Sequence, residues 1–203
     1  MMEEIYSRQR EDIYIPSSVT IIGLGGIGSW MALDMAMIGV KTLYLHDPDV
    51  VEESNLSRTP YKVLHIGVKK VEAARDLILE RRPTTDVYTF SNEVRTFADL
   101  SSSEKSGNLR IDCRDNVEDL GGIIHLALGY DGEGITLHQW PDYDSVIGTT
   151  GGGYEQDTYV AVPQLLAALA TYWVCRIYPI RQIGDERHMT LNLKDIFKER
   201  GLI

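Results

Sequence analysis

The stretch "IIGLGGIGSW", residues 21–30, spaces three glycines as G-x-G-x-x-G between a short apolar run and a helical pattern. In such a turn, Gly23 allows the tight bend, Gly25 lets the backbone approach a phosphate, and Gly28 allows the helix to pack closely on the strand. The helix start adds unpaired N–H groups and a partial positive charge. This spacing predicts a strand, turn and helix that bind a nucleotide phosphate, with a glycine-tolerant turn without a ligand as the alternative.

The hydrophobic pattern of the chain alternates between short apolar runs and helical periodicity. The expected strands are residues 17–23, 41–47, 86–94, 108–113 and 134–140, and the expected helices are 26–39, 67–83, 116–129 and 160–180. Ser- and Gly-rich stretches at 101–108 and 148–157 are expected to be loops. This alternation predicts an α/β fold: a single doubly wound Rossmann-like domain over residues 1–203, with a mostly parallel sheet, helices on both faces and a mixed C-terminal part.

The overall charge and the cysteine count exclude some classes of function. A net charge of −10 disfavours nucleic acid as the main partner, because an acidic surface repels a phosphate backbone. The two cysteines form no CxxC pair, so neither a zinc site nor a disulfide framework is indicated. No signal peptide is visible at the N-terminus, and we expect a cytoplasmic protein.

The apolar segment 160–180 is the one stretch that resembles a membrane span. Polar or helix-breaking residues interrupt it at Pro163, Gln164, Thr171 and Arg176, so it falls short of the roughly 20 apolar residues that a span needs. We therefore expect no membrane crossing here but a buried helix, with a place at a subunit interface as one option.

Polar residues after the second expected strand distinguish between kinds of nucleotide. Asp47 ends that strand, where a carboxylate accepts a hydrogen bond from a ribose hydroxyl in dehydrogenases as well. In the following "SNLSR", Asn55 is suited to bind phosphate oxygens and Arg58 to hold a polyphosphate in its fork. The alternative for this segment is a loop cap at Ser54 and a solvated arginine.

Further charged residues lie at the expected starts of helices. Lys69 and Lys70 oppose the helix dipole by about 0.3–1 kcal/mol, a cost that a bound phosphate offsets; a pair of solvated lysines is the equally weighted alternative. Asp115 follows a buried strand and is either the N-cap of a helix, with Glu118 completing a capping box, or a ligand for Mg²⁺ beside a triphosphate.

Taken together, these motifs resemble the ThiF/MoeB/HesA family of adenylyltransferases, which are relatives of ubiquitin-activating enzymes. The similarity covers residues 6 to about 130 and includes "YSRQ", "GLGGIG", D-x-D at Asp47 and Asp49, "SNLSR", a G-x-x-K ending at Lys70, and "DCRDN". Family members bind ATP and Mg²⁺, and they adenylate the carboxylate of a ubiquitin-like or sulfur-carrier protein whose C-terminus is usually Gly-Gly.

The resemblance implies a role for each matching residue. The nucleotide would be bound by Gly23, Gly25, Gly26 and Gly28, and its ribose by Asp47. The phosphates would be bound by Asn55, Arg58 and Lys70, and Mg²⁺ by Asp115. Arg8 resembles the arginine that reaches into the partner protomer's site, which implies a homodimer.

The chain also departs from the family pattern. It lacks the paired CxxC motifs of zinc-binding members, and residues 146–159 contain no cysteine, so we expect adenylation without zinc and without an enzyme thioester. Cys113 and Cys175 are expected to be core thiols. Residues 151–153 are either a flexible loop or the lining of a channel for the acceptor's tail.

Other functions stay open at this point. The acceptor is alternatively a short peptide, a small acid or an RNA base. An NAD-dependent dehydrogenase accounts for the glycines and Asp47 but leaves Arg58, Lys70 and Asp115 without roles. A non-catalytic scaffold, or one half of a heterodimer, is the third alternative.

Overall fold

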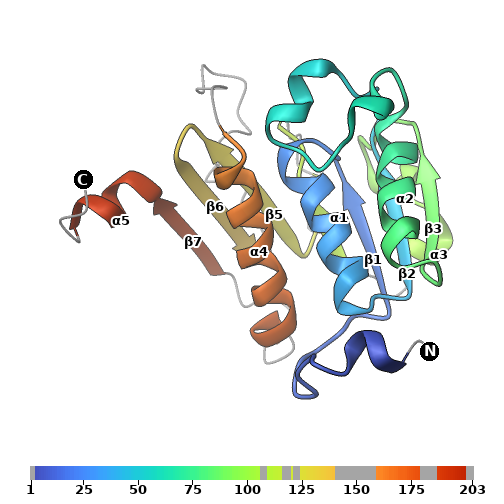
Figure 1. Ribbon diagram of the computed structural model, residues 1–203, viewed down its shortest axis with the longest axis horizontal. Helices are drawn as coiled ribbons and strands as arrows, with labels where there is room; N and C mark the ends of the chain where they lie inside the picture. The colour runs from blue at the N-terminus through green and yellow to red at the C-terminus, as the bar shows by residue number, and fades with distance from the viewer. Residues whose placement is uncertain are drawn as a thin grey trace.

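The protein folds around one mixed sheet of seven strands in the order β3-β2-β1-β4-β5-β6-β7 (Figure 1). A computed structural model describes residues 3–105, 109–115, 120, 124–139, 159–178 and 187–199. The strands are β1 (Ser18–Ile22), β2 (Thr42–His46), β3 (Asp86–Phe90), β4 (Leu109–Asp112), β5 (Leu126–Asp131), β6 (Gly134–Gln139) and β7 (Arg187–Asn192). Neighbouring strands from β3 through β5 are parallel, and β6 and β7 are antiparallel to their neighbours.

Among the described residues, three longer helices cover one face of the sheet, and one helical turn lies against the other. The first three are α1 (Gly26–Ile38), α2 (Lys70–Arg81) and α4 (Ala161–Arg176), which lie side by side in Figure 1. The turn α3 (Ser102–Lys105) lies against the opposite face, where Glu104 approaches Thr20 of β1. Helix α5 (Leu193–Glu199) follows β7 at the end of the sheet. Short 3-10 helices are η1 (Glu3–Tyr6), η2 (Glu53–Ser57), η3 (Val63–His65) and η4 (Phe97–Asp99).

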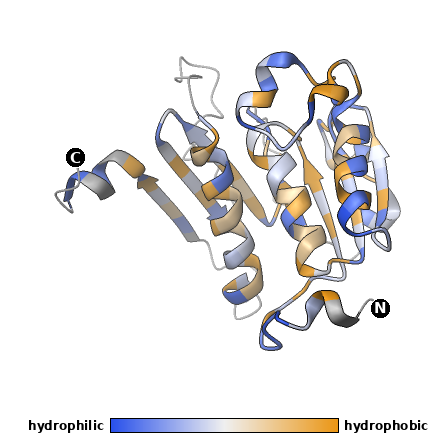
Figure 2. Cartoon of the chain, viewed as in Figure 1, coloured by the Kyte–Doolittle hydropathy of each residue, from blue (hydrophilic) through white to orange (hydrophobic). Residues whose placement is uncertain are grey.

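The buried core follows the alternation of side chains along the strands. Val19 and Ile21 of β1 belong to the large cluster under α1, α2 and α4, whereas Ile22 belongs to a smaller cluster with Val94 and Leu100 on the other face. Figure 2 shows hydrophobic residues along β1 and α4 and hydrophilic residues on the outward side of α2. None of the helices in the described part of the chain combines the length and apolar character that a membrane crossing requires.

The structure confirms the predicted fold class and corrects three local predictions. The helix predicted over 116–129 is wrong at its end, because residues 126–131 form strand β5. Most of this run is buried between two neighbouring strands, and a short apolar run does not show a helical or strand period of its own. The predicted N-cap pair of Asp115 and Glu118 extends outside the described residues, as does the predicted loop 148–157.

The other two corrections concern the segment after β3. The strand predicted over 86–94 ends at Phe90. The loop predicted over 101–108 contains the helical turn α3, which begins with a capping box: the backbone N–H of Ser101 donates to Glu104 Oε2 at 2.8 Å, and that of Glu104 to Ser101 Oγ at 3.4 Å. This S-x-x-E signal is visible in the sequence.

Candidate active site

The strand order reverses between β1 and β4, and a cavity of about 220 Å³ lies at their carboxyl ends. Chain connections leave the sheet in opposite directions at such a switch point, which opens a crevice for ligands in α/β folds. Gly23 follows β1 and Cys113 follows β4, and both line the cavity. A smaller adjoining cavity of about 120 Å³ extends toward Leu128 and Tyr130 of β5.

The glycine turn supplies the floor of this cavity. Gly23 has φ of +86°, and a Cβ there would lie 2.9 Å from the carbonyl oxygen of Cys113. A Cβ on Gly28 would overlap the carbonyl oxygen of Gly23, so both positions require glycine. A Cβ on Gly25 would meet no protein atom within 4 Å, and helix α1 begins there without a side-chain cap. The open backbone at the start of α1 fits an anion such as phosphate.

Asp47 and Lys70 form the side of the cavity that follows β2. The Asp47 carboxylate accepts hydrogen bonds from the backbone N–H of Leu24 at 2.6 Å and of Asp49 at 2.9 Å. Lys70 Nζ lies 2.8 Å from Asp49 Oδ2 and 3.8 Å from Asp47 Oδ1. Burial raises the pKa of Asp47, and Lys70 together with the two backbone N–H groups opposes that rise. Lys70 lies in the first turn of α2, as predicted, and Asp49 balances its charge.

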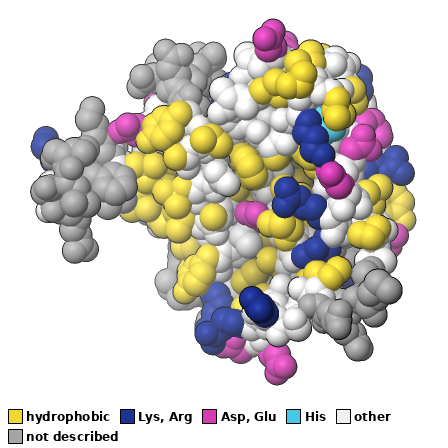
Figure 3. Space-filling view, viewed as in Figure 1, with side chains coloured by type: hydrophobic (Ala, Val, Ile, Leu, Met, Phe, Trp, Pro, Cys, Tyr) yellow, Lys and Arg dark blue, Asp and Glu magenta, His cyan; other side chains and the backbone are white. Residues whose placement is uncertain are grey.

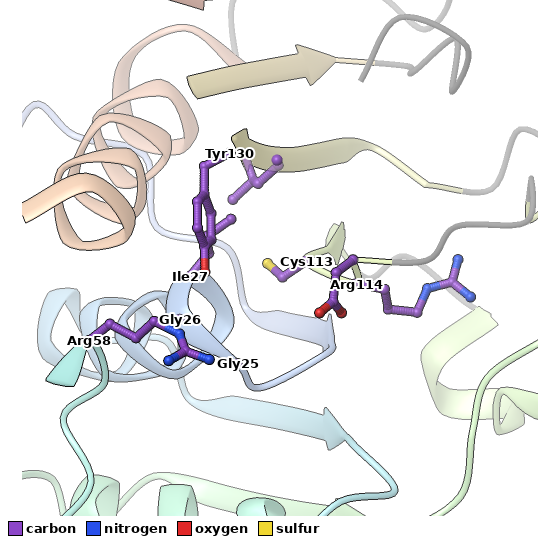
Figure 4. Close-up of a pocket in the computed structure, with 10 residues that line it drawn as sticks. Gly25, Gly26, Ile27, Arg58, Cys113, Arg114 and Tyr130 are labelled. Carbon is purple, nitrogen blue, oxygen red and sulfur yellow. The ribbon is translucent and has the colours of Figure 1, made fainter. Parts of the chain in front are cut away.

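Asn55 lies on η2, and Arg58 is the residue at its C-terminal end. Asn55 is buried, and its side-chain oxygen accepts the backbone N–H of Glu52 at 3.0 Å, which closes a capping box. Arg58 Nη1 donates to the carbonyl of Ser54 at 2.9 Å, and the Arg58 carbonyl accepts Trp30 Nε1 at 3.0 Å. Figure 4 shows the guanidinium near Gly25, and both residues line the two cavities.

The segment after β4 forms the opposite side. Arg114 donates to both oxygens of Asp112, at 2.9 and 2.7 Å, and to the carbonyl of Val94 at 2.8 Å, which fixes the backbone there. Asp115 is exposed and lines both cavities. Burial raises the pKa of the Cys113 thiol well above its ordinary value, so this thiol is protonated at neutral pH and is a poor nucleophile.

The carboxylates of the site fit one kind of metal binding. Among the described residues no group of three or more His, Cys, Asp and Glu side chains is placed to hold a metal ion. Mg²⁺ at nucleotide sites commonly takes one or two carboxylates, with phosphates and waters as its other ligands. Asp115 fits this role, and a complete ligand set would require the nucleotide.

The structure brings most of the predicted site residues together. Residues that line the larger cavity are Gly23, Gly25, Gly26, Asp47, Asn55, Arg58, Lys70 and Asp115. Gly28 packs behind the turn instead. Arg8 is exposed and does not line its own chain's cavity; its neighbour Gln9 donates to the carbonyl of Ile38, at the far end of α1. Residues 151–153 lie outside the described residues.

Two tyrosines at the site were missed by the sequence analysis. Tyr130 lines both cavities from β5, and the wrong helix over 116–129 obscured its position at a strand end. Tyr61 is buried, and its hydroxyl donates a hydrogen bond to the Leu24 carbonyl at 2.9 Å, which stabilises the glycine turn. Only the fold brings Tyr61 beside Leu24, and no local signal in the sequence indicates this contact.

The comparisons with known proteins agree on one family. The model of the ThiF family matches residues 3–121. The molybdopterin-synthase adenylyltransferase of Escherichia coli strain K12 is 38% identical over 102 residues, which is 50% of this chain and 41% of that protein. The ubiquitin-like modifier-activating enzyme 5 of Caenorhabditis elegans is 30% identical over 123 residues, which is 56% of this chain and 28% of that protein. The matched part thus spans less than half of these relatives.

Solved structures show the same fold. A crystal structure of PaaA superposes with a TM-score of 0.67 and 27% identity, covering 88% of this chain and 61% of that one. Escherichia coli MccB, crystallised with ATP, superposes with a TM-score of 0.65 and 17% identity, covering 87% of this chain and 63% of that one. At such low identity, the likeness to MccB supports the fold alone.

Proposed function

Because this chain belongs to the ThiF family, we propose that it uses ATP to adenylate the C-terminal carboxylate of a ubiquitin-like or sulfur-carrier protein. The names of its relatives, adenylyltransferase and ubiquitin-like modifier-activating enzyme, support this reaction class. The observation that carries the proposal is one cavity that joins the open glycine turn at α1 with Asp47 and the cations Arg58 and Lys70. A dehydrogenase needs no such pair of cations.

The proposed reaction needs positioning and charge neutralisation more than proton transfer. The acceptor's carboxylate oxygen attacks the α-phosphorus, and the bond from that phosphorus to the departing pyrophosphate breaks, which gives an acyl-adenylate. The attacking group is already ionised at neutral pH, so no general base is required. Arg58 and Lys70 would neutralise the charge that develops on pyrophosphate, and Asp47 would orient the ribose.

Mg²⁺ is proposed as the accompanying ion, with Asp115 as its protein ligand. Bound there, the ion would supply positive charge to the phosphate oxygens. Residues of the chain would hold the rest of the substrate: the start of α1 would bind phosphate, and Arg58, at the C-terminal end of η2, would bind it from the side. A protonated, buried Cys113 supports transfer without an enzyme thioester.

The proposal extends to the partner and the assembly. The small adjoining cavity is lined by Gly25, Gly26 and Gly129 among others, and a narrow Gly-Gly tail would suit such a space. Arg8 lies away from its own cavity, which is compatible with a homodimer in which it enters the partner's site.

ATP–pyrophosphate exchange tests the function directly. The chain is incubated with Mg²⁺, ATP, labelled pyrophosphate and size-fractionated extract of the source cells. We expect a small-protein fraction to drive exchange, and Arg58→Ala to abolish it. Arg75→Ala is the matched control, because Arg75 is a surface residue of α2 that pairs with Glu72 outside the cavity.

The other outcomes redirect the proposal. Exchange driven by a low-mass fraction would identify a short peptide or small acid as the acceptor. ATP binding without exchange in any fraction would indicate a scaffold or one subunit of a heterodimer. Full exchange by Arg58→Ala would contradict the proposed site.

A further inference from the structure

Tyr130 extends from the carboxyl end of β5 over the start of α1. Leu126 and Leu128, on the same face of β5, belong to the main hydrophobic cluster, and Tyr130 packs against its edge. Figure 4 shows the ring reaching from β5 into the cavity, with its hydroxyl end toward Gly26 and Ile27. The strand and the cluster therefore hold the base of this side chain firmly.

The hydroxyl of Tyr130 lies at the first turn of α1. Its Oη is 3.0 Å from the position that a Cβ on Gly26 would occupy, and Pro163 Cβ of α4 is 3.3 Å from the same position. A Cβ at residue 26 would lie closer to both groups than ordinary van der Waals contact, so Tyr130 or Pro163 would have to shift by a few tenths of an ångström. Glycine at this position thus accommodates Tyr130, whereas the space in front of Gly25 is left open.

The open space in front of Gly25 is surrounded by hydrogen-bond donors from different elements. The start of α1 presents backbone N–H groups, Arg58 lies beside Gly25 from η2, and Tyr130 enters from β5. A phosphate has three or more oxygens that need donors from several directions, and a phenolic hydroxyl donates well to an anion. Tyr130 is placed to supply the direction that neither α1 nor η2 covers.

We propose that Tyr130 is a phosphate-binding residue, whose hydroxyl donates a hydrogen bond to the nucleotide phosphate held at the start of α1. This inference rests on the proposed function and deepens it. Tyr130 lines both the larger cavity and the smaller cavity toward β5, so it contacts the phosphate on the side where the acyl group enters. That phosphate is the one nearest the acceptor, and Tyr130 orients it for attack.

Calorimetric titration with ATP and with adenosine tests this assignment on the whole chain. Tyr130→Phe removes only the hydroxyl and keeps the packing of the ring, so the variant is expected to fold. We expect its Kd for ATP to rise about tenfold or more, the effect of losing one hydrogen bond to a charged group. Its affinity for adenosine, which has no phosphate, should be unchanged. Tyr172→Phe, on the exposed face of α4, is the control and should bind ATP like the wild type.

Each contrary result has a defined meaning. If Tyr130→Phe binds ATP as tightly as the wild type, the phosphate contact is wrong while the proposed function stands. If ATP and adenosine lose affinity equally, the hydroxyl supports the pocket structurally, and the assignment is again overturned. If the wild-type chain binds no ATP at all, the proposed function fails together with this inference.

Discussion

The two sides of the cavity are built differently. On the side after β2, each charged group has a second, structural partner: Asp47 holds the backbone of Leu24 and Asp49, and Asp49 holds Lys70. On the side after β4, the pair of Arg114 and Asp112 holds the backbone in place. Asp115 is exposed there and has no hydrogen bond or ion pair to another described residue. Figure 3 shows Lys and Arg side chains gathered over the region of α1 and α2, and an apolar surface over α4.

This difference separates two kinds of constraint on the sequence. Residues after β2 serve folding and binding with the same contacts, so their substitution is expected to affect both. Residues after β4 divide the two tasks, so a substitution of Asp115 is expected to affect function alone.

The glycine turn gives the largest expected contrast. Gly28→Ala would place a Cβ on the carbonyl oxygen of Gly23 and 3.2 Å from Cys113 Cβ, so we expect a loss of about 3 kcal/mol or more in the free energy of unfolding. Gly25→Ala meets no protein atom, and its stability should stay within about 1 kcal/mol of the wild type. Its Cβ enters the phosphate space instead, so ATP binding should weaken. Urea unfolding and ATP titration of both variants measure the two effects.

Equal stability of the two glycine variants would break this distinction. It would mean that the backbone between Gly23 and α1 shifts enough to accommodate a Cβ at residue 28 as well as at residue 25. Undiminished ATP binding by Gly25→Ala would place the phosphate elsewhere in the cavity.

The two carboxylates give the next contrast. Asp47→Ala and Asp115→Ala should each lower the rate of ATP–pyrophosphate exchange by about 100-fold or more, because each removes a group proposed to hold the nucleotide or its ion. Only Asp47→Ala should also destabilise the fold, by about 1–3 kcal/mol, since it leaves the buried N–H of Leu24 without its acceptor. Thermal or urea unfolding of the purified variants separates the two cases, and a fully stable Asp47→Ala would contradict the structural role of that carboxylate.

Sequence reasoning succeeded where the relevant contacts are close along the chain. The turn from Gly23 to Gly28 is specified by neighbouring residues, and the structure places it as predicted. Strand β2 ends at His46, one residue before Asp47, and α2 begins at Lys70, within the helix predicted over 67–83. Strand β5 was missed because its state depends on pairing with β4 and β6, and the apolar run itself is compatible with a helix. Tyr130 was missed with it. The pair of Lys70 and Asp49 likewise depends on bringing α2 against the segment after β2, which no local pattern specifies.

The smallest predicted effect concerns a contact between α1 and α4. Asp34 of α1 accepts a hydrogen bond from the Thr171 hydroxyl of α4 at 3.3 Å, and burial raises its pKa to about 6. The unfolded chain has an ordinary pKa near 3.9 at this carboxyl, so the folded protein retains a proton there that the unfolded chain has lost. Stability from this group is therefore full below about pH 4 and is lost as the pH rises through about 6.

Asp34→Asn removes this titration and keeps an oxygen acceptor for Thr171. We expect the variant to be more stable than the wild type by about 1–2 kcal/mol at pH 7, with the difference shrinking as the pH falls toward 4. Urea unfolding of both proteins from pH 4.5 to 7.5 measures that difference, and groups that titrate in both proteins cancel in it. A difference that stays constant with pH would show that Asp34 is ionised without cost between α1 and α4. In that case water reaches this contact, and α1 and α4 pack together less closely than the structure indicates.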